Sequence, residues 1–208
     1  MDRCFLGLSL PPSLTASLLE TVGSLASPPT KAPSPFHLTP EANLHLTLKF
    51  LGDTTSLQIQ SLCEGLPTFH PYLELPSIRV HGVGAFPSPQ SPKAVFAGIG
   101  IGTGTTSLVT LGNALDQLCE PLGFTPETRA RIPHITLARV RSEADDEHRA
   151  QLGSWLQRFD STPLGLLFDA QSPSGSEETL LCLYRSHLRP SGSHYERLCH
   201  VPLGRENQ

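Results

Sequence analysis

Two short stretches in which apolar and polar residues alternate constrain the fold of this chain more than any other feature. The first, NLHLTLKFLG at positions 43–52, alternates strictly, which is typical of a half-buried β-strand. Its apolar face comprises Leu44, Leu46, Leu48 and Phe50, and its polar face His45, Thr47 and Lys49. Because residues two apart on a strand stand about 7 Å from each other, the side chains of His45 and Thr47 can both reach one small anionic group.

The second stretch, PHITLAR at positions 133–139, repeats the pattern about half a chain later. Ile135 and Leu137 again form an apolar face, which leaves His134 and Thr136 together on the other face. The two matching strands predict a chain built of two similar halves, each contributing one histidine and one threonine to a shared cleft.

The match between the two stretches matters because a single H-x-T is weak evidence. The segment His37-Leu38-Thr39-Pro40 also fits it, yet no apolar alternation continues beyond Pro40, and proline has no N–H to donate to a sheet ladder. We therefore expect a loop or an edge segment there, and we interpret His37 as a coincidental match.

Length and charge limit the partners of the chain. Its 208 residues can bury a substantial core, and we expect one unit made of two lobes. The formal net charge of −4 supplies no basic field for long nucleic acids, so any contact with RNA must come from groups close to the site. No protein partner is implied, and we expect a monomer.

The cysteines and the apolar runs bear on the compartment. The five cysteines are scattered, odd in number and without a C-x-x-C pair, which is typical of reduced cytosolic thiols. The apolar run at positions 4–10 is too short for a signal peptide and stops at Pro11-Pro12, and no stretch approaches the length of a membrane span. These features predict a soluble cytoplasmic protein without membrane contacts.

The order of the predicted elements indicates an α+β fold. Besides the two histidine strands, we expect strands at 3–10, 78–86, 93–99, 164–168, 179–184 and 195–201, and helices at 13–25, 55–65, 105–122 and 144–159. Ser13 is the expected N-cap of the first helix. Because hairpins interrupt any uniform β-α-β repeat, we expect two antiparallel-rich sheets facing a central cleft, with the helices outside.

Two segments have an unusual composition. The glycine-rich turn at 98–104 matches neither G-x-G-x-x-G nor G-x-x-x-x-G-K-[ST], so it specifies no nucleotide cradle. The proline-rich segment 27–35 has no apolar periodicity and is predicted to be a loop.

Two imidazoles facing each other across a cleft suit a reaction that removes a proton at one point and delivers one at another. Two neighbouring hydroxyls can hydrogen-bond phosphate oxygens, so the set suits phosphoester chemistry without a metal. Arg129 and Arg131 lie close enough in sequence to add a cation, whereas Arg139 falls on the face opposite His134 if the strand is regular. H-E-x-x-H, tight metal-ligand spacings and a G-x-S-x-G elbow are all missing.

With these motifs the chain resembles the two-histidine phosphoesterase superfamily, and within it the LigT-like RNA 2',3'-cyclic phosphodiesterases once named 2'-5' RNA ligases. The segments that carry the resemblance are RCFLGL at 3–8, HLTLKFLG at 45–52, the block 129–139, LYRS at 183–186 and GSHY at 192–195. The resemblance implies a single bilobal domain over residues 1–208 with internal pseudo-two-fold symmetry, in which each lobe supplies one H-x-T-x strand. It also implies that no cofactor and no metal take part.

The resemblance further implies hydrolysis of a terminal 2',3'-cyclic phosphate to a 2'-phosphate, on RNA 3' ends or on nucleotides. His45 would then be the proton donor and His134 the proton acceptor. The candidate substrate-binding residues are Thr47, Thr136, Arg129 and Phe50. Two alternatives stay open: the reverse reaction, which joins RNA ends through a 2'-5' bond, and a protein that binds RNA ends or nucleotides without turnover.

Overall fold

The computed structural model describes residues 1–26, 36–68, 75–100, 102–141, 152, 155–159, 161–170, 179–189 and 192–203. The predicted loop 27–35, most of the predicted helix 144–159 and the tail 204–208 lie outside these described residues.

The elements confirm the predicted α+β class. The strands are β1 (Asp2–Leu8), β2 (Phe36–Leu38), β3 (Leu46–Thr54), β4 (Ile78–Phe86), β5 (Ala94–Ile99), β6 (His134–Val140), β7 (Pro163–Phe168), β8 (Leu180–Arg189) and β9 (Gly192–Pro202). The helices are α1 (Pro12–Ala26), α2 (Ser56–Gly65) and α3 (Thr103–Cys119), with short 3-10 turns η1 (Glu41–Asn43), η3 (Glu120–Leu122) and η4 (Gln157–Phe159). The predicted antiparallel hairpin is β4 with β5.

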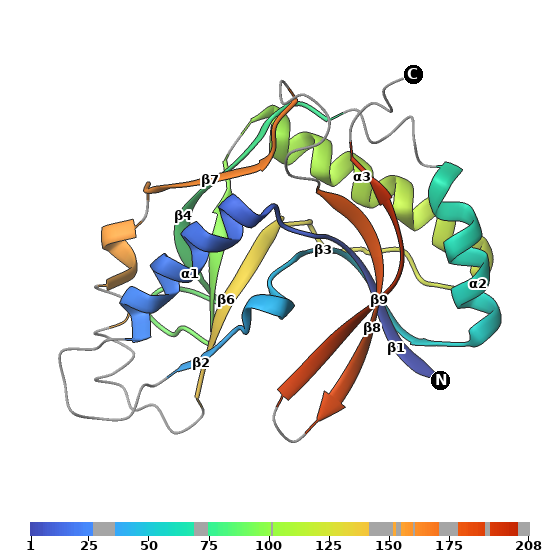
Figure 1. The fold of residues 1–208 in the computed structure, drawn as a ribbon, viewed down its shortest axis with the longest axis horizontal. Coiled ribbons are helices and arrows are strands. Elements are labelled where there is room, and N and C mark those ends of the chain that lie inside the picture. The colour runs from blue at the N-terminus through green and yellow to red at the C-terminus, as the bar shows by residue number, and fades with distance from the viewer. Residues whose placement is uncertain are drawn as a thin grey trace.

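The strands form one antiparallel sheet in the order β7-β4-β5-β6-β3-β1-β8-β9, with β2 also pairing with β6. Strand β3, which His45 directly precedes, and strand β6, which begins at His134, lie at the centre, and we call them the histidine strands. Among the described residues they share one ladder pair, Leu46 with Ile135. The two predicted sheets are therefore two halves of a single sheet, which curls around itself in Figure 1. We call β3-β1-β8-β9 the first half and β6-β5-β4-β7 the second half.

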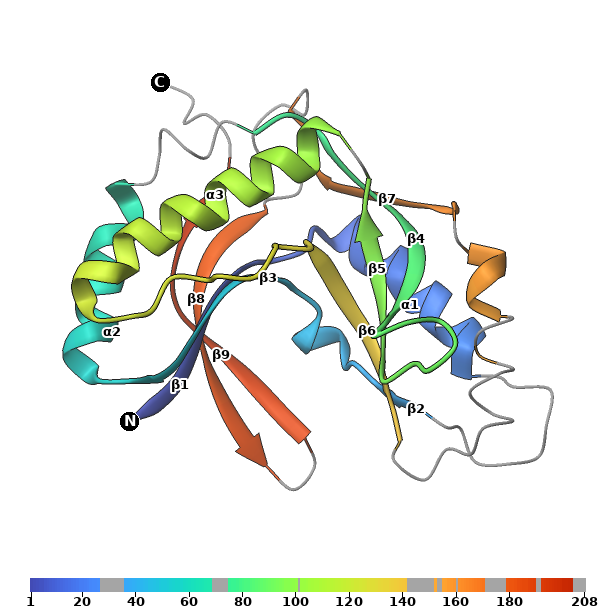
Figure 2. The same cartoon turned by 180° about the vertical axis from the view of Figure 1, so that it is seen from behind.

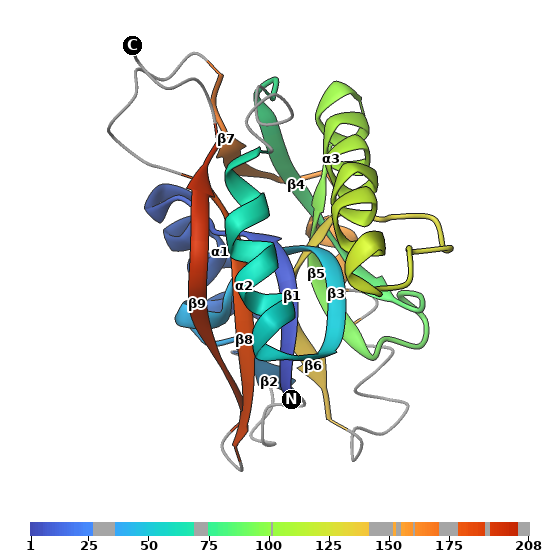
Figure 3. The ribbon, with the colours of Figure 1, turned by 90° about the vertical axis from the view of Figure 1, so that its right-hand side faces the viewer.

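Two helices cross between these halves. Helix α1 follows β1 of the first half but packs against β7, β6 and β2. Helix α3 follows β5 of the second half but packs against β3 as well as β4, and Figure 2 shows it running across one end of the curled sheet. Helix α2 lies against α3 and β9 on the outer side of the first half (Figure 3). None of the described helices is both long and apolar enough to cross a membrane.

Local sequence signals explain where the helices begin. Thr55 caps α2: its hydroxyl accepts the backbone N–H of Gln58, and the Gln58 side chain accepts the N–H of Thr55 at 2.9 Å, which is a capping box. Helix α1 instead begins at Pro12, a residue suited to the first helical position because an N–H there would lack a helical partner. The predicted N-cap Ser13 therefore lies inside the helix.

A disulfide corrects the prediction that all five cysteines are reduced. Cys63 of α2 and Cys199 of β9 are bonded, with their Cα atoms 5.7 Å apart. They are separated by 136 positions, and a pairing between such distant cysteines cannot be deduced from their spacing. The free cysteines, all buried, are Cys4, Cys119 and Cys182. The disulfide ties the outermost strand of the first half to α2.

Candidate active site

The candidate active site lies where the two halves of the sheet meet. The side chains of Leu46 and Ile135, the ladder pair that joins β3 to β6, are fully buried in the core at 0% exposure. Because neighbouring residues on a strand point to opposite faces, the residues on either side of this pair project from the other face of the sheet. Those residues are His45, Thr47, His134 and Thr136, which we call the quartet.

In the antiparallel register, each histidine stands opposite the threonine of the other strand. Counting one position from the Leu46–Ile135 pair, His45 stands opposite Thr136. On the other side of the pair, Thr47 stands opposite His134. Each histidine therefore has its own threonine two positions along the chain and the other strand's threonine across from it. The four candidates taken from the sequence are thus brought together.

Both histidines are anchored in the same way. The Nδ1 atom of His45 lies 2.7 Å from the carbonyl oxygen of Asn43, and that of His134 lies 2.7 Å from the carbonyl oxygen of Ile132. A carbonyl oxygen can only accept, so Nδ1 carries the hydrogen in each ring. The Nε2 atom of each neutral ring is therefore the one left to exchange a proton with a substrate.

The surroundings of His45 are aromatic and closely packed. Its ring centroid lies 4.7 Å from that of Phe5 and 5.1 Å from that of Tyr195, the latter edge-on. Its Nε2 accepts a hydrogen bond from the Thr47 hydroxyl at 2.9 Å. Asn43, whose carbonyl anchors the ring, is itself buried and donates from its side chain to the carbonyl of Ser193 at 2.6 Å. Sequence reasoning missed this role of Asn43.

Burial lowers the pKa of His45 below its ordinary value of 6.5. The hydrogen bond to the carbonyl of Asn43 acts in the opposite direction, and the charge of protonated His134 adds to the lowering. His45 is therefore mainly neutral at pH 7 in the ligand-free protein.

His134 stands beside two aromatic rings of the second half and next to a cavity. Its ring centroid lies 4.9 Å from that of Phe86 and 5.4 Å from that of Phe96, both edge-on. The cavity measures about 330 Å³, a size that suits a small ligand. Its lining includes Thr47 and Phe50 of β3, Phe86 of β4, His134 and most of the segment 125–133.

A β-bulge in β3 changes the faces predicted for two residues. Leu6 of β1 pairs with Lys49 and Gly7 pairs with Thr47, so Leu48 is an extra residue without a partner on β1. The bulge reverses the alternation after Leu48. Lys49, predicted on the polar face, is buried at 4% exposure, whereas Phe50, predicted on the core face, is 76% exposed.

The role of Phe50 as a substrate contact stays a prediction. This residue lines the cavity together with Thr47, and its ring centroid lies 6.2 Å from that of Phe5, which also stands beside His45.

Strand β6 has the same irregularity at the equivalent place. Val95 of β5 pairs with Ala138 and Phe96 pairs with Thr136, which leaves Leu137 as the extra residue. Ala138 is consequently buried and Arg139 is exposed on the face that carries Thr136. The prediction that Arg139 falls on the opposite face is therefore wrong, because it assumed a regular strand. The adjacent apolar residues Leu137 and Ala138 were the one signal of this bulge.

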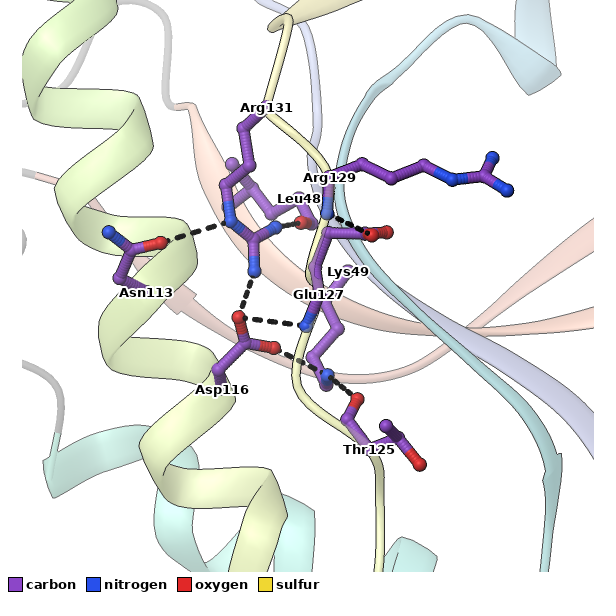
Figure 4. Close-up of polar contacts among 8 residues, drawn as sticks. All are labelled: Leu48, Lys49, Asn113, Asp116, Thr125, Glu127, Arg129 and Arg131. Carbon is purple, nitrogen blue, oxygen red and sulfur yellow. Dashed lines mark hydrogen bonds and ion pairs between the residues drawn. The ribbon is translucent and has the colours of Figure 1, made fainter.

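The buried Lys49 belongs to a network of charges that Figure 4 shows. Its Nζ lies 2.5 Å from Oδ1 of Asp116 on α3 and donates to the carbonyl of Thr125 at 2.9 Å. The other carboxylate oxygen of Asp116 bonds the guanidinium of Arg131, which also donates to the carbonyl of Leu48. Arg131, one of two candidate phosphate cations, is thus engaged within the protein.

The electrostatics of Asp116 follow from its neighbours. Burial alone would raise the pKa of its carboxyl group, but the hydrogen bonds from Lys49 and Arg131 outweigh burial and lower it. Asp116 is therefore ionised at neutral pH, as its two cationic partners require.

The remaining candidates lie around the quartet. Arg129 is exposed, lines the cavity and points away from Asp116 in Figure 4, while its backbone N–H donates to Glu127 at 2.9 Å. His37 lies on the short edge strand β2 and pairs with Arg139, so it is no part of the quartet. This agrees with the predicted edge segment.

The donor atoms of the quartet suit an anion better than a metal. Two imidazoles and two hydroxyls offer hydrogen bonds, whereas hard cations prefer carboxylate and carbonyl oxygens. In the part of the chain that the structure describes, no three His, Cys, Asp or Glu side chains gather in a group that could hold a metal ion.

Sequence comparisons point to phosphoesterases. A family model described as LigT like Phosphoesterase matches residues 8–96. A protein of Aeropyrum pernix named RNA 2',3'-cyclic phosphodiesterase is 32% identical over 107 residues, which span 51% of this chain and 58% of that relative. A protein of the same name from Methanothermobacter thermautotrophicus is 29% identical over 157 residues, or 74% of each chain.

Solved structures share the fold over nearly the whole chain. The crystal structure of TT0787 of Thermus thermophilus superposes with a TM-score of 0.68 at 25% identity, covering 97% of both chains. The structure of E. coli LigT complexed with 3'-AMP gives a TM-score of 0.62 at 19% identity and covers 97% of this chain and 98% of that one. Over part of its sequence and over nearly the whole of its fold, this chain is therefore similar to LigT-like phosphoesterases.

Proposed function

We propose that the protein hydrolyses 2',3'-cyclic phosphates, at RNA 3' ends or on nucleosides, to 2'-phosphates without a metal ion. The crossed quartet at the junction of β3 and β6 is the observation that carries this proposal. Two imidazoles and two hydroxyls flank the Leu46–Ile135 pair, and each ring has Nδ1 on a backbone carbonyl, so Nε2 is the atom available to transfer a proton. The names of the curated relatives point to the same substrate.

Hydrolysis needs a base and an acid on opposite sides of the phosphorus. His134 removes a proton from water as its oxygen bonds to phosphorus, and His45 delivers a proton to the 3' oxygen as the bond from phosphorus to that oxygen breaks. The product carries the phosphate on the 2' oxygen. Thr47 and Thr136 donate hydrogen bonds to the phosphate oxygens, which requires the Thr47 hydroxyl to leave Nε2 of His45.

Two exposed arginines are available to bind the negative charge. Arg139 shares the face of β6 that carries Thr136, and Arg129 lines the cavity beside His134. Guanidinium groups favour phosphate contacts, with about 1.5–3 kcal/mol for each hydrogen bond to a charged group. Their replacement should therefore weaken substrate binding more than it slows turnover.

The lowered pKa of His45 means that the ring must be protonated on substrate binding if it is to act as the acid. The ring is mainly neutral at pH 7 in the free protein, so it must gain a proton before it can donate one. A bound phosphate supplies a negative charge beside the ring, which favours the protonated form.

The decisive experiment supplies purified protein with each of the four nucleoside 2',3'-cyclic phosphates and identifies the products by chromatography. The 2'-phosphate should form, and formation should persist in excess EDTA. Formation of the 3'-phosphate would contradict the proposed geometry, and loss of activity in EDTA followed by rescue with a divalent ion would contradict the metal-free mechanism.

The two alternatives give different results in related assays. An RNA-end-binding protein would retain the cyclic nucleotide in equilibrium dialysis and release no product. A ligase would join RNA with a 2',3'-cyclic end to RNA with a 5'-hydroxyl, because the same acid and base must also serve the reverse reaction. Water at its full concentration favours hydrolysis.

A substrate whose leaving group needs no proton separates the two histidines. With a nitrophenyl ester of a nucleoside phosphate, His45→Ala should keep most of its activity, while His134→Ala should stay inactive. The opposite pattern would exchange the two roles. Failure of both variants would mean that both rings mainly bind the phosphate.

A further inference from the structure

We propose that Asp116, with Lys49 and Arg131, is a positioning device that fixes the spacing of the two histidine strands across the active site. This inference rests on the proposed function, since it concerns the geometry of the same quartet. It assigns a role to a buried cluster of charges on α3, β3 and the segment before β6, whose members bond one another and of which Lys49 and Arg131 also border the cavity.

The need for such a device follows from how little backbone pairing joins the two strands. Among the described residues, Leu46 and Ile135 form the one ladder pair between β3 and β6. Counting on by two positions, Leu48 would stand opposite Pro133, which has no N–H to donate. Beyond their single pair the strands separate, and the cavity opens between 47–50 and 129–134.

Arg131 replaces the missing ladder bond. Leu48 is the bulged residue and has no partner on β1. The guanidinium of Arg131 donates to the carbonyl of Leu48, so a side chain spans the gap that the backbone leaves open. Arg131 lines the cavity and lies just before β6, which begins at His134. Its bond to Leu48 therefore sets the distance between the two strands.

Asp116 holds both sides of the gap at once. One carboxylate oxygen bonds Lys49, the residue after the bulge, and the other bonds Arg131 on the opposite side, as Figure 4 shows. The side chains of the three residues are 11%, 2% and 12% exposed respectively, so little water competes for these bonds. The Nε of Arg131 also donates to Asn113 on α3 at 3.2 Å, which adds a second attachment to the same helix.

Short stretches of backbone connect this cluster to the reacting groups. Lys49 stands two residues after Thr47 on β3. Arg131 directly precedes Ile132, whose carbonyl anchors Nδ1 of His134 at 2.7 Å. A displacement of Arg131 would therefore shift the imidazole of His134 relative to Thr47.

A glycine on α3 makes room for the cluster. A Cβ added at Gly112 would lie 3.0 Å from both Cδ and Nε of Arg131. Glycine inside a helix is otherwise unfavourable compared with alanine, so its presence at the closest approach to Arg131 fits a requirement for space. Gly23 in α1 offers a matched comparison, since no heavy atom lies within 4 Å of its added Cβ.

Removal of one charge would leave its partners buried and unpaired, which destabilises any fold. The test therefore replaces all three together, as Lys49→Met/Asp116→Leu/Arg131→Met, because apolar residues of similar volume often substitute for a buried ion cluster without loss of stability. The companion variants are Gly112→Ala and its control Gly23→Ala. Melting temperature, kcat and KM with a nucleoside 2',3'-cyclic phosphate are measured for each.

We expect the triple variant to stay folded and to lose about 10- to 100-fold in kcat, with KM changed by less than about three-fold, because a small misplacement of reacting groups slows the chemical step. Gly112→Ala should lose about three- to ten-fold in kcat with an equal or higher melting temperature. Gly23→Ala should leave kcat unchanged. A folded triple variant, or a folded Gly112→Ala, with the kcat of the parent would overturn the positioning role.

A readout independent of activity separates this inference from the proposed function. The ring nitrogen and proton resonances of His134 report its bond to the carbonyl of Ile132, and they should move in the triple variant and in Gly112→Ala but not in Gly23→Ala. If the parent protein hydrolyses no cyclic phosphate, the proposed function fails, while these resonances still test the positioning device. Unchanged His134 resonances in both variants would mean that the cluster contributes only to packing and does not position His134.

Discussion

The two histidine strands use the same backbone devices in different chemical surroundings. In both, Nδ1 of the histidine bonds the carbonyl two residues earlier, and a bulge three residues later turns the strand over. After the bulge in β3 come a buried lysine and an exposed phenylalanine. After the bulge in β6 come a buried alanine and an exposed arginine. The backbone thus sets which positions after each bulge are buried and which are exposed, and the residue types at those positions give the two halves different chemical properties.

The surroundings of the two histidine rings also differ. His45 is packed between Phe5 and Tyr195 and its pKa is lowered, whereas His134 lies at the wall of a cavity. Among the residues that the structure describes, a charged side chain bonds the carbonyl of the bulged residue only in the first half, where Arg131 donates to Leu48. The comparison teaches that a shared scaffold can give one histidine a packed site and the other an open one.

The largest expected effect comes from removing either ring. His45→Ala and His134→Ala should each lower turnover of a 2',3'-cyclic nucleotide by about 10²- to 10⁴-fold, because each removes one proton transfer. Steady-state kinetics on variants checked by circular dichroism measures the loss. His37→Ala is the control and should be nearly silent. If His37→Ala abolished turnover while His45→Ala did not, the assignment of the quartet would be wrong.

Removing the disulfide tests whether the first half depends on a covalent cross-link that the described part of the second half lacks. Replacement of Cys63 and Cys199 by serine should lower the free energy of unfolding by about 2–5 kcal/mol, since the bond closes a long loop of the unfolded chain. Urea denaturation without reductant measures the change. The parent protein in reductant should match the variant, and equal stability with and without reductant would contradict a formed bond.

The exposed residues after the two bulges should differ in how they bind substrate. Arg139→Ala should raise KM by about ten-fold or more, because it removes hydrogen bonds to a charged group. Phe50→Ala should raise KM by a smaller factor, since only apolar contact is lost. Initial rates at low and high salt distinguish them, because the arginine effect should shrink as salt screens the charge. An unchanged KM in Arg139→Ala would remove this residue from the binding face.

The smallest expected effect concerns pH. If His45 donates the proton, the free protein is active only while that ring is charged, so kcat/KM should fall as pH rises through its lowered pKa, below 6.5. Tyr195→Ser should reduce the burial of the ring, raise its pKa and move this limb to higher pH. Leu57→Ser, at an exposed site on α2, should leave the limb in place. A limb that stayed fixed in Tyr195→Ser would assign it to another group.

The alternation of the sequence was sufficient to predict which residues at the centre of the candidate site enter the core. Leu46 and Ile135 lie in the core, and the histidine and threonine on either side of each face outward, as the pattern indicates. The direct pairing of the two strands could not be deduced, because alternation reports which face a residue occupies and says nothing about its neighbour across the sheet.

The features that escaped prediction depend on one extra residue or on distant contacts. In LTLKF the alternation continues through the bulge at Leu48, so no pattern warned that Lys49 turns inward. Its partner Asp116 lies 67 positions away on α3, and the two bonded cysteines lie 136 positions apart. Such pairings depend on how α2, α3 and the sheet pack together, which local sequence does not encode.

The order of the strands also has a consequence for synthesis of the chain. The first half takes β1 and β3 from the start of the sequence and β8 and β9 from near its end, while residues 78–168 supply β4–β7 of the second half. As the ribosome makes the chain, β1 can pair with β3 early, but its other edge waits for β8. An unpaired strand edge attracts other chains. The nascent protein must therefore keep that edge covered until its last strands emerge.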